Sequence, residues 1–160
     1  MALVMVAFSL NALGQASETA TATATIVTPI AIANASDMNF GNIAVIATGG
    51  TVVLTPAGAR SATGDVTLPA TAGTVSAASF TVTGTANFTY SITLPAAALT
   101  ISNGTHNLTV DTWTSDPTPT GTLDGTGAQT LNVGATLNVA GGESSGTYTG
   151  GPFTVTVNYN

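Results

Sequence analysis

The residues able to carry out acid–base chemistry are few in this chain and widely spaced. His106 is the only histidine, and Asp111 is the first acid that follows it. Their odd spacing would place the two side chains on opposite faces of one strand, so the carboxylate could not orient the imidazole as a Ser-His-Asp site requires. We therefore expect no catalytic centre at His106 and no enzymatic activity.

Metal and cofactor binding have equally little support. The chain has no cysteine, and a single histidine cannot build a multi-histidine metal site. Asp111, Asp116 and Asp124 are candidate calcium ligands, but their spacing matches no EF-hand loop, and capping of turns by Asx-type hydrogen bonds also explains them. The sequence predicts no metal and no cofactor.

Charge is scarce throughout the chain. Lys and Arg total 1 and Asp and Glu total 7, which gives a formal net charge of -6 at pH 7. Charged residues make up 5 % of the chain, against about 25 % in an ordinary soluble domain. Because Arg60 is the only cation, the chain cannot neutralise a phosphate backbone, and nucleic acid is excluded as a partner.

The N-terminus has the pattern of an export signal. The run from Met1 to Leu13 is apolar and uncharged, and it is too short for a transmembrane helix, which needs about 20 residues. Gly14-Gln15-Ala16 fits the small-x-small pattern that precedes signal-peptidase cleavage. The sequence therefore predicts a signal peptide over 1–16, a single secreted domain over 17–160 and no membrane span in the mature chain.

The remaining chain is rich in Thr and Gly and alternates between apolar and polar residues. In Phe88–Leu94 and Pro152–Tyr159 every second residue is apolar, as in a half-buried strand. The other predicted strands are Met38–Val45, Thr51–Thr55, Gly64–Leu68, Ser79–Thr83, Leu99–Ser102, Asn107–Thr114, Gln129–Val133 and Thr136–Ala140. Asn-Gly and Asp-Gly dipeptides mark tight turns between them. This pattern predicts an all-β fold, an immunoglobulin-like or pilin-like antiparallel β-sandwich of about 8–10 strands.

Another alternating run, Thr19–Ile32, lies at the start of the mature chain. Its apolar face consists mainly of Ala20, Ala22, Ala24 and Ile26, and threonines form most of the other face. Pro29 has no N–H to donate, so it confines this strand to a sheet edge or divides it in two. Two arrangements are open: the run is the first strand of its own domain, or residues 17–32 are an extension donated to another copy.

The C-terminal residues GTYTGGPFTVTVNYN carry a specific signature. Tyr159 is penultimate, and Gly146 lies fourteen positions before Asn160. This end resembles that of chaperone–usher pilins, which also carry an alternating N-terminal extension that completes the sandwich of the neighbouring subunit. The resemblance implies a periplasmic chaperone and usher as partners and a second copy as the assembly partner. The implied acceptor edge is Phe153, Val155, Val157 and Tyr159.

A second resemblance covers most of the mature chain. The runs DMNFGNI at 37–43, ASFTVTG at 78–84 and YSITLP at 90–95, followed by the C-terminal strand, resemble domain of unknown function family 4402. This family consists of exported bacterial β-domains, and membership implies an exported immunoglobulin-like sandwich with no particular activity.

These observations lead to one expected function and one alternative. We expect a secreted, non-catalytic structural protein, a subunit of a pilus-like filament at the cell surface that assembles by β-strand donation. The chain has no Lys and few other charges, and charged residues are a common protection of edge strands against pairing. The alternative is a monomeric adhesive or carbohydrate-binding module, for which Trp113 and Tyr148 would form the aromatic platform.

Overall fold

The computed structural model of the protein describes residues 14–160, so the predicted signal peptide lies, apart from Gly14 to Ala16, outside the described residues. Within 14–160 the chain forms strands and no helix, which confirms the predicted all-β fold. The ten strands are β1 Ala31–Ser36, β2 Ala44–Leu54, β3 Arg60–Thr67, β4 Ala78–Thr83, β5 Thr89–Thr93, β6 Leu99–Ser102, β7 Asn107–Asp116, β8 Thr120–Thr122, β9 Ala128–Ala140 and β10 Thr156–Tyr159. In the described part of the chain no helix could cross a membrane.

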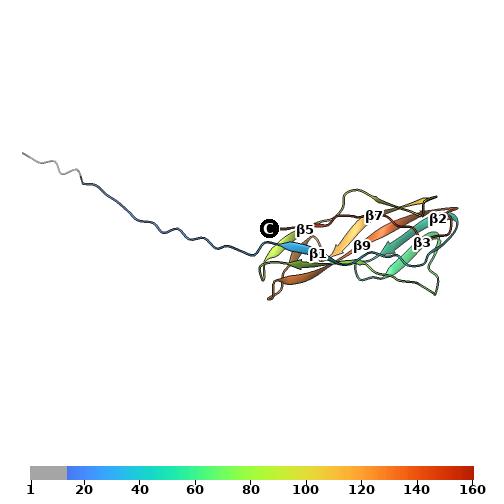
Figure 1. Ribbon diagram of the computed structural model, residues 1–160, viewed down its shortest axis with the longest axis horizontal. Helices are drawn as coiled ribbons and strands as arrows, with labels where there is room; N and C mark the ends of the chain where they lie inside the picture. The colour runs from blue at the N-terminus through green and yellow to red at the C-terminus, as the bar shows by residue number, and fades with distance from the viewer. Residues whose placement is uncertain (1–13) are drawn as a thin grey trace, which may run out of the picture.

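The strands form two antiparallel sheets of a β-sandwich, and Figure 1 shows them packed into one elongated body. β9 is the central strand of the larger sheet, because β4 pairs with its first half, β2 with its second half, and β7 along its middle. β1, β3 and β6 extend this sheet beyond β4, β2 and β7. The smaller sheet has the strand order β10-β5-β8.

The long strand β9 corrects one prediction from the sequence. Gln129–Val133 and Thr136–Ala140 were expected to be two successive strands, but they belong to one continuous strand. Gly134 between them does not make a turn. Its backbone packs so closely on the Leu54 carbonyl at the end of β2 that a side chain would collide with it. The glycine therefore allows β9 to pass from β4 to β2 without interruption.

Two clusters of buried side chains fill the body. The first cluster contains the apolar residues of β2, β7 and the second half of β9, among them Val52, Leu54 and Leu137. The second cluster contains those of β4, β5, β10 and the first half of β9, and Tyr90 is its largest fully buried side chain. Met38 and Trp113 pack against both clusters, so the two halves of the body meet at these two side chains.

The alternating N-terminal run does not form the strand that its sequence predicts. Residues 14–30 belong to no strand, and every residue from Gly14 to Pro29 is exposed. Regular pairing begins only at Ala31, where β1 meets β4. The alternation makes this segment suited to a strand, but a β-ladder needs a partner, and no strand of the described chain lies beside it. We call residues 14–29 the tail; in Figure 1 it extends away from one end of the body.

Candidate functional site

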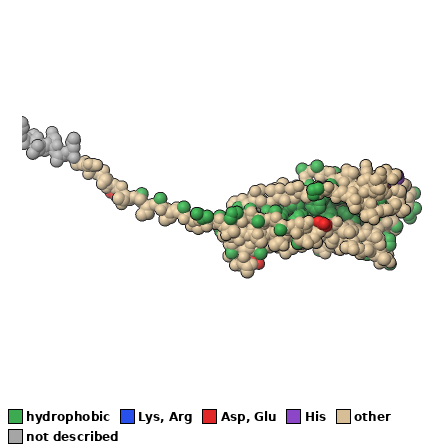
Figure 2. Space-filling view, in the orientation of Figure 1, with side chains coloured by type: hydrophobic (Ala, Val, Ile, Leu, Met, Phe, Trp, Pro, Cys, Tyr) green, Lys and Arg blue, Asp and Glu red, His purple; other side chains and the backbone are tan. Residues whose placement is uncertain are grey.

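The body has an open groove over the larger sheet, lined by residues of β4, β6, β7 and β9 and by none of the strands of the smaller sheet. β1 pairs only with β4 and β10 only with β5, so within the described chain each of these strands has an unpaired edge. The groove, of about 1050 Å³, runs between two irregular segments. We call residues 37–45, which follow β1, the first wall, and residues 143–153, which precede β10, the second wall. Figure 2 shows hydrophobic side chains inside a hollow in the face of the body.

The first wall differs from the sequence prediction. Met38–Val45 was predicted to be a strand, but β2 begins only at Ala44. The interruption occurs at Gly41, whose φ of 69° lies in the left-handed region that glycine adopts readily. The side chain of Asn39 supports this bend, because its Oδ1 accepts a hydrogen bond of 2.8 Å from the Gly41 N–H.

The only cation of the chain holds the bend of the first wall in place. Nη1 of Arg60, at the start of β3, donates to the main-chain carbonyl of Phe40 and to that of Asn42, the latter at 3.1 Å. This role of Arg60 does not follow from the sequence, because binding to main-chain carbonyls leaves no trace in residue spacing. The bend turns four apolar side chains of the first wall toward the groove: Met38, Phe40, Ile43 and Val45.

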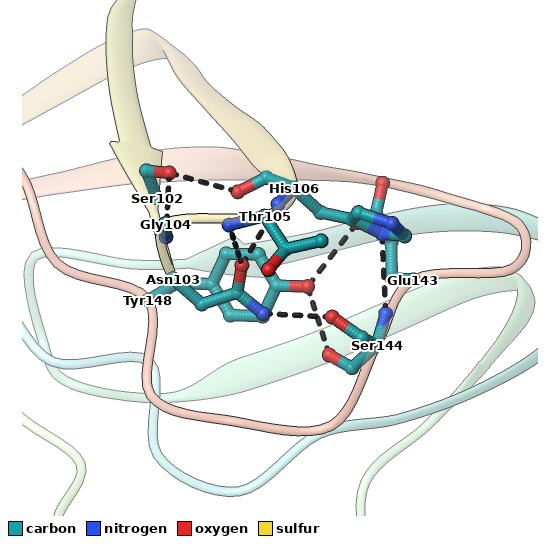
Figure 3. Close-up of polar contacts among 8 residues, drawn as sticks. All are labelled: Ser102, Asn103, Gly104, Thr105, His106, Glu143, Ser144 and Tyr148. Carbon is teal, nitrogen blue, oxygen red and sulfur yellow. Dashed lines mark hydrogen bonds and ion pairs between the residues drawn. The ribbon is translucent and has the colours of Figure 1, made fainter.

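The second wall is tied to the β6–β7 turn by a polar cluster (Figure 3). Nδ1 of His106 lies 2.9 Å from Oε2 of Glu143 and 3.2 Å from the main-chain nitrogen of Ser144. The Tyr148 hydroxyl lies 2.8 Å from the Ser144 carbonyl and 3.2 Å from Oε2 of Glu143. Asn103 completes the cluster, because its Nδ2 donates to Oγ of Ser144 at 2.9 Å.

His106 therefore has a carboxylate partner that the sequence analysis did not find. Asp111, the acid considered there, is not its partner; Glu143 is, and it comes from a distant loop. No local spacing could reveal this pair, because the two residues are far apart in the sequence and the loop after β9 brings Glu143 to the β6–β7 turn. The hydrogen bonds join one loop to one turn, so the geometry gives His106 a structural role in positioning the second wall.

The floor of the groove is formed mainly by residues that belong to the first core cluster or pack against it. A bulge in β7, at Thr112 with its φ of 49°, shifts the register so that both Val110 and Trp113 line the groove despite their odd spacing. The Trp113 ring is tilted against Phe153 at a centroid distance of 4.6 Å, and Phe153 meets Phe80 edge-on at 6.4 Å. The other floor residues are Leu99, Ile101, Leu108, Leu137 and Val139.

Trp113 and Tyr148 do not form the exposed platform considered for sugar binding. Both are half-buried and line the groove, but the Trp113 ring packs on Phe153, and the Tyr148 hydroxyl is directed to Glu143 and Ser144. Phe40, Phe80 and Phe153 also line the groove, so its aromatic side chains are distributed along the groove rather than gathered in one exposed platform.

The four predicted acceptor residues have different surroundings. Phe153 lines the groove directly. Val155 and Val157 are buried in the second core cluster, so their side chains are not exposed at the surface. The Tyr159 ring stacks edge-on against Phe88 at a centroid distance of 5.5 Å, and its hydroxyl contacts the root of the tail at Thr28.

The predicted donor residues all lie outside the body. Ala20, Ala22 and Ala24 are exposed, and Ile26 has a relative exposure of 98 %. A large apolar side chain that is almost fully exposed loses the free energy that burial would provide. The apolar face of the tail is therefore unsatisfied in the isolated chain.

The acids of the chain form no metal site among the described residues. Oδ1 of Asp124, one of the calcium candidates, instead accepts hydrogen bonds from the N–H and the hydroxyl of Thr126 and from the N–H of Ala128. These bonds stabilise the carboxylate and hold the pKa of Asp124 below its usual value, the side-chain bond to Thr126 contributing most. Asp124 is thus a turn-capping residue, as the alternative explanation proposed.

The fold and the site define a β-sandwich domain with an unclosed apolar groove and an unpaired N-terminal tail. The model of a family described as Domain of unknown function (DUF4402) matches residues 30–159, and the chain belongs to this family. The match begins at Ile30, directly after the tail. No curated protein and no solved structure matches the chain.

Proposed function

We propose that the protein is a secreted, non-catalytic structural subunit that assembles by inserting the tail of one copy into the groove of the next. The resulting assembly is a pilus-like filament at the cell surface. A single observation carries this proposal: the same chain has an open apolar groove and an exposed, alternating segment that lacks a partner.

The groove suits a strand better than a small molecule. Its volume of about 1050 Å³ lies at the upper end of ligand pockets, which measure roughly 300–1,000 Å³. Along the chain, the first wall follows β1 and the second wall precedes β10, and each of these strands has an unpaired edge. Such edges offer main-chain donors and acceptors in the regular series that strand addition uses. A small ligand would leave most of these groups without a partner.

The tail has the length and side chains for such an insertion. A strand of about 10 residues spans roughly 33 Å, and Ser17 to Thr28 provides that length. The small side chains of Ala20, Ala22 and Ala24 would allow a close approach to the groove floor, and Ile26 would supply one large apolar contact. The threonines of the opposite face would remain in water.

The weak charge of both surfaces is compatible with this docking. Asp37 and Glu143 are the acids of the groove lining, and Glu18 is the single acid of the tail from Ser17 on. Neither surface has a cation, so association would depend on apolar burial and main-chain hydrogen bonds. We expect assembly to be largely insensitive to salt, because there is little charge to screen.

The experiment compares the chain from Ser17 to Asn160 with a chain that begins at Thr28. Sedimentation and electron microscopy over a range of concentrations would measure assembly. The shorter chain should fold, because no hydrogen bond of the described body involves a residue before Thr28. We expect filaments from the longer chain and monomers from the shorter one.

A matched pair of variants tests the face that inserts. Ala24→Asp places a charge on the apolar face, which should abolish assembly, because burial of an unpaired carboxylate is costly. Thr23→Asp adds the same charge on the opposite face and should leave filaments intact. Monomers from the unmodified chain at every concentration, or equal effects of the two variants, would overturn the proposal.

A further inference from the structure

Strand donation between copies has a competitor within each molecule. A short flexible tether holds its end at an effective concentration of about millimolar, whereas copies in solution meet at micromolar concentrations. A tail free to turn back would therefore fill its own groove about a thousandfold more readily than that of a neighbour. Assembly requires a feature that prevents this reversal.

The structure has such a feature where the tail joins the body. The Thr85 hydroxyl accepts a hydrogen bond of 2.9 Å from the Thr28 N–H and lies 3.3 Å from the Thr28 carbonyl, to which it donates. The Tyr159 hydroxyl donates to the same carbonyl at 2.8 Å and accepts from the Thr85 N–H at 2.6 Å. Both main-chain polar groups of Thr28 are thus bound by the body.

The body holds Tyr159 firmly in this position. Its ring packs edge-on against Phe88. Gly84 lies so close to its hydroxyl that any side chain at position 84 would displace it. Pro29 constrains the backbone of Thr28 as well, because a residue before proline is restricted to extended conformations.

We propose that Thr28, Thr85 and Tyr159 form an anchor that directs the tail away from the body and reserves the groove for the tail of another copy. This inference rests on the proposed function. To reach its own groove the tail would have to turn at Thr28 and Pro29 and run back along the free edge of β1. A hairpin there would use the N–H and carbonyl of Thr28, which the anchor occupies, and Pro29 has no N–H to contribute.

The test releases the anchor in the chain from Ser17 to Asn160. The double variant Thr85→Val, Tyr159→Phe removes both hydroxyl groups and keeps the shape of both side chains. Ser91→Ala is the matched control, because it removes a hydrogen bond of 3.2 Å between β5 and the Asn158 carbonyl, next to the anchor but not part of it. Using Thr85→Ser in place of Thr85→Val restores a hydroxyl group to the double variant and should rescue the behaviour of the unmodified chain.

Two measurements are needed: sedimentation for assembly and hydrogen exchange for the amides of residues 19–27. We expect the double variant to be monomeric at concentrations about a thousandfold above those at which the unmodified chain assembles. Its tail amides should nevertheless be protected, because the tail fills its own groove. A purely structural role of the anchor would not give protected tail amides in a monomer.

The outcomes separate the two proposals. If the unmodified chain does not assemble, the proposed function fails, whatever the variants do. If it assembles and the double variant assembles equally well, the proposed function stands and the anchor is refuted. A monomeric double variant with unprotected tail amides would also refute the anchor, since the tail would then be free without entering its own groove.

Discussion

Replacing Ile26 with alanine provides a quantitative test of strand donation. Ile26 has a relative exposure of 98 % in the isolated chain, so nearly its whole side chain can be buried on insertion. The substitution removes three side-chain carbons, at about 0.8 kcal/mol each, which gives about 2.4 kcal/mol. Because about 1.4 kcal/mol corresponds to a factor of ten, the concentration for half-assembly should rise roughly 50-fold.

Trp113 makes this shift measurable without a label. It is the only tryptophan of the chain and lines the groove, so its fluorescence should change when a tail enters. Dilution of the assembled protein, followed by this fluorescence and by sedimentation, would give the half-assembly concentration for the unmodified chain and for Ile26→Ala.

The adjacent position supplies the matched control. Val27 is also apolar and exposed, at 38 %, but alternation places it on the threonine face of the tail. Val27→Ala should change assembly by no more than about 0.5 kcal/mol, as surface substitutions usually do. Equal shifts for the two variants would refute a face-specific insertion, and an unchanged half-assembly concentration for Ile26→Ala would refute burial of this side chain.

Three further predictions concern the body itself. Tyr90→Phe should lower the free energy of unfolding, measured with denaturant, by about 0.5–1.5 kcal/mol, because the buried ring loses its 2.8 Å hydrogen bond to Gln129. Hydrogen bonds, chiefly from threonine side chains, hold the pKa of Asp65 and that of Asp124 below their usual value. The stability that these two carboxylates contribute should therefore be complete above about pH 5 and be lost as the pH falls through their folded-state pKa values. Asp124→Asn should lessen this loss at acid pH, as measured by thermal unfolding. His106→Ala should speed hydrogen exchange of main-chain amides in the second wall, because its tie to the β6–β7 turn is lost.

The sequence predicted the parts of this fold that depend on local patterns. Phe88–Leu94 and Asn107–Thr114 alternate, and strands β5 and β7 lie there. The irregular positions did not follow from alternation. Gly134 looks like a turn residue but lies inside a strand, and the bulge at Thr112 changes which residues share a face.

The site was less predictable than the fold, because distant contacts create it. The alternation of the tail and of the C-terminal strand indicated a donor and an acceptor. It did not indicate the groove, whose first wall is shaped by Arg60 and whose second wall is held by His106 and Glu143. Each of these contacts joins segments that lie far apart in the sequence. Neither the small number of charged residues nor their local spacing indicates which residues pair.

The proposed contact also predicts the form of the assembly. The tail joins the body at Thr28, beside Tyr159, which packs against the second core cluster. The groove floor, in contrast, includes Leu137 and Val139 of the first cluster. Donor and acceptor are thus different surfaces of each copy, and such heterologous contacts build open chains unless a rotation closes them into a ring. A chain that begins at Thr28 can accept a tail but cannot donate one. Added in small amounts to the chain from Ser17, it should shorten filaments seen by electron microscopy without changing their width, whereas the same chain with Val110→Asp in the groove floor should not. Unchanged filament lengths with the first additive would contradict a chain of donated strands.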